Sequence, residues 1–313
     1  MIVIDAETVD RFADWPGVVA ALKAGHKRPK PQIGDVHFTD GGNGLLSRSA
    51  WISGLGSCVK AATIFPGNVT GPSGMPTVQG SLVLFDPGNG STRAVIDGAA
   101  VTRWKTASDS ALGSQFLSRA ESRVLLMIGA GSMSEPLIRA HLSVRPGIER
   151  VALFNRTPGR AAAVAQRLAD IGRPVELFGD LEAAVRAADI ISVATMSTQP
   201  LVQGAWLKPG AHLDLVGAYT PQMREADNDA MRRSRIFVDF RDTTIGHIGE
   251  LMIPIRDGVI AQSDVLGDLY DLVAGAPGRQ SDQDITLYKN GGGGHLDLMT
   301  AVAILEAAGQ RGA

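Results

Sequence analysis

Length, composition and charge set the first limits on this chain. It has 313 residues, 44% hydrophobic and 20% charged, so it is long enough for two ordinary domains and too apolar for a long disordered region. Thirty Lys and Arg against 32 Asp and Glu give a formal net charge of −2, which argues against nucleic acid or an anionic membrane surface as a partner.

The N-terminal residues lack the basic and apolar regions of a signal peptide. No later stretch approaches the roughly 18 uninterrupted apolar residues of a membrane span, so we expect neither export nor membrane insertion. The single cysteine, Cys58, excludes an intrachain disulfide and a cysteine-rich zinc cluster. These features predict a cytoplasmic protein.

The first hundred residues contain short β-rich segments separated by glycine-rich turns. Gly44–Ile52 and Leu55–Phe65 come first, followed by Gln79–Asp86 and Thr92–Asp97 with the turn Pro87-Gly88-Asn89-Gly90 between them. This pattern predicts an antiparallel meander.

After these segments the apolar residues first recur at helical spacing, and then strand-like and helix-like segments alternate. Apolar residues at helical spacing predict a long connecting helix from Ala99 to about Arg119. Beyond Arg123, short apolar runs alternate with helical stretches as far as about Ala274, which is typical of βαβ units in a parallel sheet. The expected strands are Val124–Ile128, Val151–Phe154, Ile190–Ala194, His212–Val216 and Ile236–Val238, and the expected helices include Met133–Val144 and Gly159–Asp170.

The end of the chain has a different pattern, with a strand at Ile285–Lys289, four consecutive glycines and a helix at Leu296–Ala308. We expect this end to return to the first domain. The predicted fold is therefore α/β, with a Rossmann-type parallel-sheet nucleotide domain at 119–284 inserted into an α+β domain formed by 1–118 and 285–313.

A glycine loop between a strand and a helix is the strongest single motif. Gly129 permits a tight turn, and Gly131 lets the backbone approach a pyrophosphate that lies at the helix N-terminus. Ser134 stands where a third glycine usually falls. The loop, Gly129-Ala130-Gly131-Ser132-Met133, is predicted to bind a dinucleotide; the alternative is a glycine turn in an empty βα unit.

The residues after the next strand indicate which dinucleotide binds. Asn155-Arg156-Thr157 occupy the place where NAD-binding units carry a carboxylate for the ribose hydroxyls. An arginine and a hydroxyl favour a 2′-phosphate, so NADPH is predicted in preference to NADH, unless Arg156 is only a solvated loop residue. Thr195, Val216 and Gly217 lie at the carboxyl ends of later strands, where such folds bind ligands.

A cationic site is predicted in the first domain. The period of two places Lys60 on one face of its strand with apolar neighbours, so this lysine either pairs, meets an anionic ligand, or is an edge residue with a solvated tip. Arg103 and Lys105 precede Asp109, and Lys105 with Asp109 fits a simple surface pair. Arg48 also lies in a strand-like segment, and a carboxylate substrate needs such a residue.

Other catalytic patterns are missing. The six histidines form no metal-ligand cluster, so no metal is predicted. Neither a phosphate-loop motif nor a serine-hydrolase elbow is present. The glycine-rich stretch Asn290–His295 leads into the last helix, and either its bare backbone faces the nicotinamide or it is a plain turn and helix cap.

Three separated motifs together resemble the ornithine cyclodeaminase/μ-crystallin family over essentially the whole chain. They are Val59-Lys60 through Pro66-Gly67-Asn68, Thr102-Arg103-Trp104-Lys105-Thr106-Ala107-Ser108-Asp109-Ser110-Ala111, and Ile128-Gly129-Ala130-Gly131. The resemblance implies a nucleotide domain inserted into a substrate and dimerisation domain built from both termini, and hence a homodimer.

The resemblance also assigns residues. Lys60 looks like the family's active-site lysine, beside the substrate carboxylate and reacting carbon. The family's usual arginine falls on Lys105, so carboxylate binding is expected to be shared with Arg103 or Arg48. Thr77 matches a cofactor contact. His295, at the end of the glycine-rich stretch, is also expected to bind the cofactor. Tyr219 occupies the place of the cyclodeaminases' catalytic aspartate and, with Asp109, is expected in the same pocket.

The missing aspartate argues against cyclodeamination, which needs a carboxylate to handle the side-chain amine. The resemblance then implies a ketimine reductase that uses NAD(P)H to convert Δ1-pyrroline-2-carboxylate or Δ1-piperideine-2-carboxylate to proline or pipecolate. The alternatives are an alanine dehydrogenase, an ornithine cyclodeaminase, and a non-catalytic NADPH-dependent binding protein of the μ-crystallin kind.

Overall fold

The computed structural model describes residues 1–69 and 74–311 and divides the chain into two compact units. Unit 1 comprises Met1–Thr106 and Gly293–Ala313, and unit 2 comprises Ala107–Gly292. The first boundary falls inside helix α3 (Gly98–Leu117), which confirms the predicted long helix. No helix within the described ranges is long and apolar enough to cross a membrane.

Unit 1 is built around a single mixed sheet. Its strands are β1 (Ile2–Ile4), β2 (Gln32–Asp40), β3 (Asn43–Ile52), β4 (Gly56–Ile64), β5 (Val78–Phe85) and β6 (Thr92–Asp97), and its helices are α1 (Ala6–Phe12), α2 (Trp15–Gly25) and α11 (Gly294–Arg311), with the 3₁₀ helix η1 (Pro66–Val69). The strand order is β1-β6-β5-β4-β3-β2. Strands β2 to β6 pair antiparallel and β1 adds parallel to β6, so the predicted meander is confirmed and extended at both edges.

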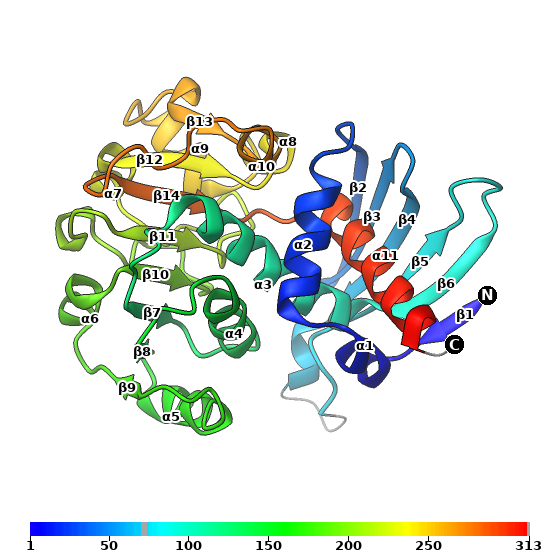
Figure 1. Ribbon diagram of the computed structural model, residues 1–313, viewed down its shortest axis with the longest axis horizontal. Helices are drawn as coiled ribbons and strands as arrows, with labels where there is room; N and C mark the ends of the chain where they lie inside the picture. The colour runs from blue at the N-terminus through cyan, green and yellow to red at the C-terminus, as the bar shows by residue number, and fades with distance from the viewer. Residues whose placement is uncertain (70–73, 312–313) are drawn as a thin grey trace. The chain divides into compact units, whose positions relative to one another are not determined.

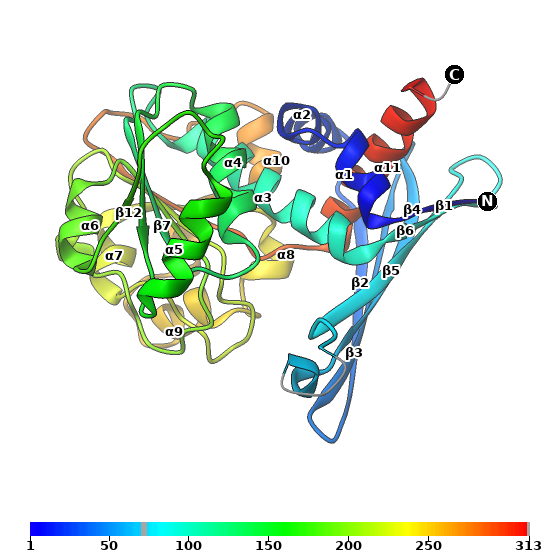
Figure 2. The ribbon, with the colours of Figure 1, turned by 90° about the horizontal axis from the view of Figure 1, so that it is seen from below.

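One face of this sheet carries the helices of unit 1. Figure 2 shows α1, α2 and α11 on the same side of β2–β6. Side chains that point to that side, such as Ala50, Ile52 and Cys58, are buried. On the opposite side Phe38 and Trp51 are 62% and 61% exposed. Because alternate residues of a strand point to opposite faces, large apolar side chains are exposed on the second face, which is bare of α1, α2 and α11.

Unit 2 is a parallel sheet with helices between its strands (Figure 1). Its strands are β7 (Val124–Ile128), β8 (Arg150–Phe154), β9 (Val175–Leu177), β10 (Ile190–Val193), β11 (His212–Leu215), β12 (Ser234–Val238), β13 (Val265–Gly267) and β14 (Ile285–Lys289). Its helices are α4 (Ser134–Val144), α5 (Pro158–Arg167), α6 (Leu181–Ala187), α7 (Asn228–Arg233), α8 (Arg241–Thr244), α9 (Gly249–Arg256) and α10 (Leu269–Val273), with the 3₁₀ helices η2 (Gly204–Trp206) and η3 (Gln262–Asp264).

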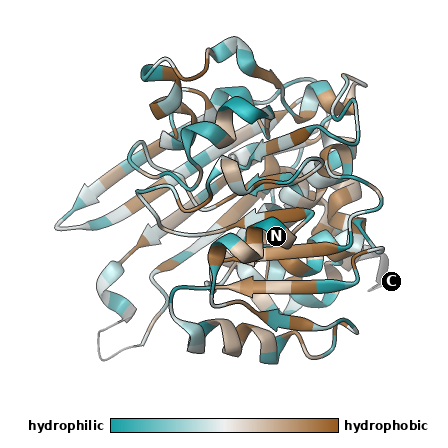
Figure 3. Ribbon diagram, turned by 90° about the vertical axis from the view of Figure 1, so that its left-hand side faces the viewer, coloured by the Kyte–Doolittle hydropathy of each residue, from teal (hydrophilic) through white to brown (hydrophobic). Residues whose placement is uncertain are grey.

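The strand order of unit 2 is β13-β12-β14-β11-β10-β7-β8-β9, and the paired strands run parallel. Its strands are largely apolar, while polar residues lie mainly on the surrounding helices (Figure 3), because both faces of a parallel sheet are covered. The chain runs outward from β7 to β9 and then restarts at β10 on the other side. This reversal between β7 and β10 is where a doubly wound sheet binds a dinucleotide, and the Rossmann-type α/β prediction is confirmed.

The unit boundaries differ from the predicted ones. The sequence placed them after Ser118 and Asp284, whereas the units divide after Thr106 and Gly292. Strand β14 pairs with β11 and β12, so it belongs to the parallel sheet rather than to the returning segment. The four glycines that follow β14, not the strand itself, mark the return. The sequence could not show which sheet β14 joins, because the residues of an apolar strand do not specify its partner strands.

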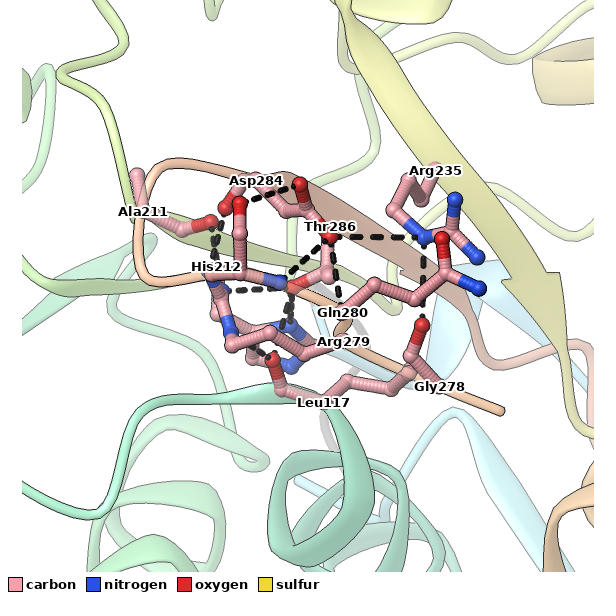
Figure 4. A network of polar contacts seen from close by, with 10 residues as sticks. Leu117, Ala211, His212, Arg235, Gly278, Arg279, Gln280, Asp284 and Thr286 are labelled. Atoms are coloured by element: carbon pink, nitrogen blue, oxygen red, sulfur yellow. Dashed lines mark hydrogen bonds and ion pairs between the residues drawn. The ribbon is translucent and has the colours of Figure 1, made fainter. Parts of the chain in front are cut away.

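A buried polar network ties the amino ends of β11 and β14 together (Figure 4). Arg279 Nε donates to the carbonyl of Leu117 at 2.8 Å, and its Nη2 donates to Thr286 Oγ1 at 3.1 Å. His212 Nδ1 lies 3.0 Å from the same hydroxyl, and burial lowers the pKa of His212 to about 3, which keeps it neutral. The network lies at the edge opposite the strand ends that bind ligands, so we assign it a structural role.

Candidate active site

The glycine loop after β7 has the geometry of a dinucleotide cradle. Gly129 has φ +110°, and a Cβ there would lie 2.5 Å from the carbonyl oxygen of Ala194, so only glycine fits. A Cβ on Gly131 would meet no protein atom within 4 Å, which leaves space for a ligand beside its backbone. Ser134 is buried and its hydroxyl donates to the carbonyl of Gly129 at 3.0 Å, so it locks the turn in place of a third glycine.

Helix α4 begins directly after this loop. Its N-cap residue, Met133, makes no side-chain hydrogen bond to the first turn. The amide of Ser134 donates to the carbonyl of Gly131 at 3.2 Å and Pro136 has no amide hydrogen, so it is the positive end of the helix dipole that favours an anion here. The loop, including Ala130 and Ser132, thus fits the pyrophosphate of a dinucleotide.

The ribose edge lies at the end of β8. Asn155 Nδ2 donates to the carbonyl of Thr157 at 2.9 Å, which shapes the turn. Arg156 and Thr157 are exposed at this turn, and none of the three residues is acidic. The arrangement is compatible with a 2′-phosphate and lacks the carboxylate that would repel it.

The turns after β10 and β11 are tied to a buried carboxylate that the sequence did not reveal. Glu225 accepts hydrogen bonds from the amide and hydroxyl of Thr195 at 2.7 and 2.8 Å and from the amide of Gly217 at 2.7 Å. The Thr195 hydroxyl proton is therefore used inside the protein rather than offered to a ligand. Val216 and Gly217 are half-buried beside it, and Tyr219 lies beyond them with 57% of its surface exposed.

Lys60 is the centre of the polar cluster in unit 1. It lies on β4, between β3 and β5, so the interpretation as an edge-strand lysine with a solvated tip is wrong. Only 5% of Lys60 is exposed, and its ammonium lies 2.8 and 2.7 Å from the two carboxylate oxygens of Asp297. It also donates to the hydroxyl of Thr102 at 3.1 Å. Because Thr102 donates its own proton to the carbonyl of Gly98, the hydroxyl can only accept from Lys60.

Asp297 comes from the first turn of α11 and was not predicted. The backbone of Gly294 lies so close to β3 that a Cβ would be 3.1 Å from the carbonyl oxygen of Ser49, and this approach brings the start of α11 onto the sheet. Burial raises the pKa of Asp297, but the charges of Lys60 and Lys105 more than offset this effect and hold the pKa below its ordinary value. Asp297 is therefore ionised at neutral pH.

The other cations predicted for the site differ in their surroundings. Lys105 is buried and acts electrostatically on both Asp297 and His295. Arg48 also acts on both, and its Nε is 2.9 Å from Asp35 Oδ2 on β2. His295 is fully buried at the start of α11, and burial together with these cations lowers its pKa well below the ordinary value, so it is neutral.

Arg103 has a different partner from the one expected. Its guanidinium pairs with Asp10 of α1, and the indole nitrogen of Trp104 donates to the same carboxylate at 2.7 Å. The Arg103 side chain is thus directed toward α1. The prediction that Arg103 binds the substrate carboxylate is therefore replaced by a role in joining α3 to α1.

Asp109 is also placed differently. It is fully buried and accepts a hydrogen bond from the hydroxyl of Tyr288 at 2.8 Å, so the interpretation of Asp109 as part of an exposed surface pair is wrong. A Cβ on Gly113 of α3 would lie 2.8 Å from the ring of Tyr288 on β14, so α3 packs closely against this strand. Thr77, by contrast, is half-buried just before β5, and its carbonyl accepts from the amide of Phe65 at 2.7 Å.

Lys105 and Arg103 are therefore expected to differ in their contribution to substrate binding. We expect Lys105→Ala to raise KM for a carboxylate substrate about tenfold or more, because a buried charge-assisted contact is lost. Arg103→Ala is expected to change KM by less than about twofold, since its exposed pair with Asp10 contributes little. Steady-state kinetics of both variants check this prediction, and equal increases in KM would return Arg103 to the carboxylate clamp.

Comparisons with known proteins agree with this geometry. Residues 25–312 match the model of the ornithine cyclodeaminase/mu-crystallin family. The Δ1-pyrroline-2-carboxylate reductase of Paracoccus denitrificans is 50% identical over 288 residues, covering 92% of this chain and 90% of the relative.

Two solved structures have the same fold over the whole chain. Thermococcus litoralis Δ1-pyrroline-2-carboxylate reductase in complex with NADH and L-proline has a TM-score of 0.93 at 25% identity, covering 100% of this chain and 98% of that one. The iminosuccinate reductase of Paracoccus denitrificans in complex with NAD+ has a TM-score of 0.92 at 29% identity, with 100% and 97% covered. The chain therefore belongs to the ornithine cyclodeaminase/mu-crystallin family.

Proposed function

We propose that this protein is an NAD(P)H-dependent ketimine reductase that converts cyclic 2-imino acids, Δ1-pyrroline-2-carboxylate and Δ1-piperideine-2-carboxylate, to proline and pipecolate. The observation that carries the proposal is an intact dinucleotide cradle together with a buried, oriented Lys60 in a chain 50% identical to a Δ1-pyrroline-2-carboxylate reductase. Reduction of an imine requires both a bound cofactor and an oriented group such as Lys60, whereas a protein that only binds ligands does not require an oriented lysine.

Unit 2 supplies the cofactor side. The space at Gly131 and the positive end of the α4 dipole fit a pyrophosphate, and the turns at Thr195 and Gly217 lie at the strand ends beyond the chain reversal. When bound, the reduced nicotinamide supplies the hydride that adds to C2 of the imine. Arg156 supports our further proposal that NADPH is preferred to NADH, because an exposed guanidinium replaces the usual carboxylate.

Unit 1 supplies the substrate side. Lys60 and Lys105 are buried cations close enough to Asp297 to lower its pKa, and a substrate carboxylate complements their positive charge. The contacts with Asp297 and Thr102 hold the Lys60 ammonium in one direction. Lys60 is thereby arranged to orient the substrate carboxylate and to act as, or position, the proton donor of the imine nitrogen.

Tyr219 stands where a cyclodeaminase needs a carboxylate, so we propose that ornithine is not a substrate. The test is absorbance at 340 nm with NADPH and NADH in parallel, using each cyclic imine, pyruvate with ammonia, and ornithine with assay of released ammonia. Rapid oxidation with a cyclic imine supports the proposal and ranks ring size and cofactor. Faster turnover of pyruvate with ammonia would make the protein an alanine dehydrogenase, and cofactor binding without turnover would make it a binding protein.

We further propose a homodimer formed through the bare face of the unit 1 sheet. Two strands of that face carry Val36, Phe38, Leu45 and Trp51, all at least 42% exposed. Several large apolar side chains exposed together on one sheet face are typical of an interface. A cytoplasmic location is also proposed, because the one cysteine, Cys58, is a buried thiol and no disulfide supports the fold.

The dimer proposal predicts a monomer on disruption of this face. Trp51→Lys is expected to weaken self-association at least about tenfold, since a central tryptophan often dominates an interface. Sedimentation velocity over a concentration series measures the change, with Leu177→Lys on unit 2, another exposed apolar residue, as the matched control. An unchanged dimer in Trp51→Lys would contradict this choice of face.

A further inference from the structure

Glu225 is a fully buried carboxylate that holds two turns at once. Its Oε1 accepts from the amide and hydroxyl of Thr195 after β10, and its Oε2 accepts from the amides of Gly217 and Ala218 after β11, at 2.7 and 3.3 Å. These partners all donate, so the carboxylate fills an acceptor position that no neutral side chain of the same size can fill. Glu225 therefore links the carboxyl ends of two adjacent strands.

The two turns approach each other unusually closely at this point. A Cβ on Gly217 would lie 2.1 Å from the carbonyl oxygen of Thr195, 2.3 Å from its amide nitrogen and 2.5 Å from Glu225 Oε1. The φ of Gly217 is not in the left-handed region, so glycine is required by space and not by torsion. The shape of this edge thus depends on the contact between the turns and on the carboxylate that joins them.

Two further buried residues act on Glu225, one through hydrogen bonds and one through its charge. Glu250 of α9 accepts from the backbone amides of Glu225 and Ala226 at 2.8 and 3.0 Å, which fixes the segment that carries Glu225. Lys289 at the end of β14 donates to the carbonyl of Leu215 at 2.8 Å. Burial raises the pKa of Glu225 to about 7, while the charge of Lys289 opposes that shift. The carboxyl group of Glu225 is therefore held by backbone amides, and the segment that carries it is held by Glu250.

The position of this clamp in the sheet indicates which half of a dinucleotide it affects. The chain reverses between β7 and β10, with β8 and β9 on one side and β10 and β11 on the other. A dinucleotide lies across such a reversal, its adenine half over the β8 side and its nicotinamide half over the β10 and β11 side. The turns joined by Glu225 belong to the second half.

We infer that Glu225 is a positioning residue that shapes the nicotinamide half of the cofactor site by joining the Thr195 and Gly217 turns. It does not touch the cofactor, because its side chain is buried beneath both turns and its oxygens are occupied by their donors. The inference rests on the proposed NAD(P)H-dependent function, and it adds a residue that neither the motifs nor the resemblance single out.

The test compares affinities for the whole cofactor and for its adenine half. Glu225→Gln offers one acceptor oxygen and places an amide against donors, so the turns are expected to separate. For Glu225→Gln we expect the Kd of NADH or NADPH, whichever binds wild type more tightly, to rise about tenfold or more, while the Kd of 5′-AMP or adenosine 2′,5′-bisphosphate changes by less than about twofold. Isothermal titration calorimetry measures both.

Two other variants separate positioning from general damage. Gly217→Ala keeps the carboxyl group but pushes both the Thr195 turn and Glu225 Oε1 away, and it should give the same split, so it decides the matter if Glu225→Gln does not fold. Thr286→Val disrupts the buried network at the amino ends of β11 and β14, the opposite edge of the sheet, and should leave both affinities unchanged even if it lowers Tm. Parallel loss of both affinities in either turn variant, or no loss of cofactor affinity, overturns the inference. Wild type that binds neither nucleotide would instead overturn the proposed function.

Discussion

Replacing Lys60 by Met is expected to lower kcat with a cyclic imine by about 10²- to 10⁴-fold, the range typical of a lost proton-transfer or orienting group. Methionine keeps the length and bulk of the side chain but removes the ammonium that Asp297 and Thr102 hold in place. Cofactor affinity should change by less than about twofold, because the pyrophosphate loop lies in unit 2. Stopped-flow absorbance and a fluorescence titration with NAD(P)H measure the two quantities.

The control for this prediction addresses folding. Removing Lys60 leaves the Asp297 charge buried without its ion-pair partner, which typically destabilises a protein by about 3–5 kcal/mol. The double variant Lys60→Met, Asp297→Asn removes both charges and should recover much of the lost Tm without recovering kcat. Recovery of turnover in the double variant, or equal loss of cofactor affinity in the single one, would show that Lys60 has only a structural role.

Substituting Gly131 by Ala is expected to weaken NAD(P)H binding about tenfold or more with no loss of stability. The added methyl group meets no protein atom within 4 Å, so the fold accepts it, but it occupies the space where a pyrophosphate approaches the backbone. Calorimetric titration with the cofactor measures the affinity, and thermal unfolding in its absence measures the stability.

Gly179→Ala is the matched control for Gly131→Ala, because a Cβ there also meets no protein atom within 4 Å and the position lies outside the loop. Its cofactor affinity should equal that of wild type. If Gly131→Ala also bound normally, the loop would be a plain turn and the nucleotide would have to bind elsewhere on unit 2.

The chain by itself contained enough information for the parallel sheet, the glycine loop and the face on which Lys60 lies. These features depend on local patterns: apolar runs of strand length, glycines between a strand and a helix, and alternation with a period of two. The turn at Gly129 and the face on which Lys60 lies could be predicted from such patterns, because both depend only on residues nearby in the sequence.

Only the tertiary structure decided which residues meet across elements. Asp297 pairs with Lys60 because α11 returns to the sheet of unit 1, and Glu225 joins two turns from a segment that follows both of them. Strand β14 pairs within the parallel sheet, although the sequence analysis assigned it to the returning segment. Arg103 pairs with Asp10 of α1 instead of contributing to the predicted cationic site. Sequence period reports the burial of a side chain, but the partner of a buried charge depends on contacts between segments far apart in the chain, which no local pattern records.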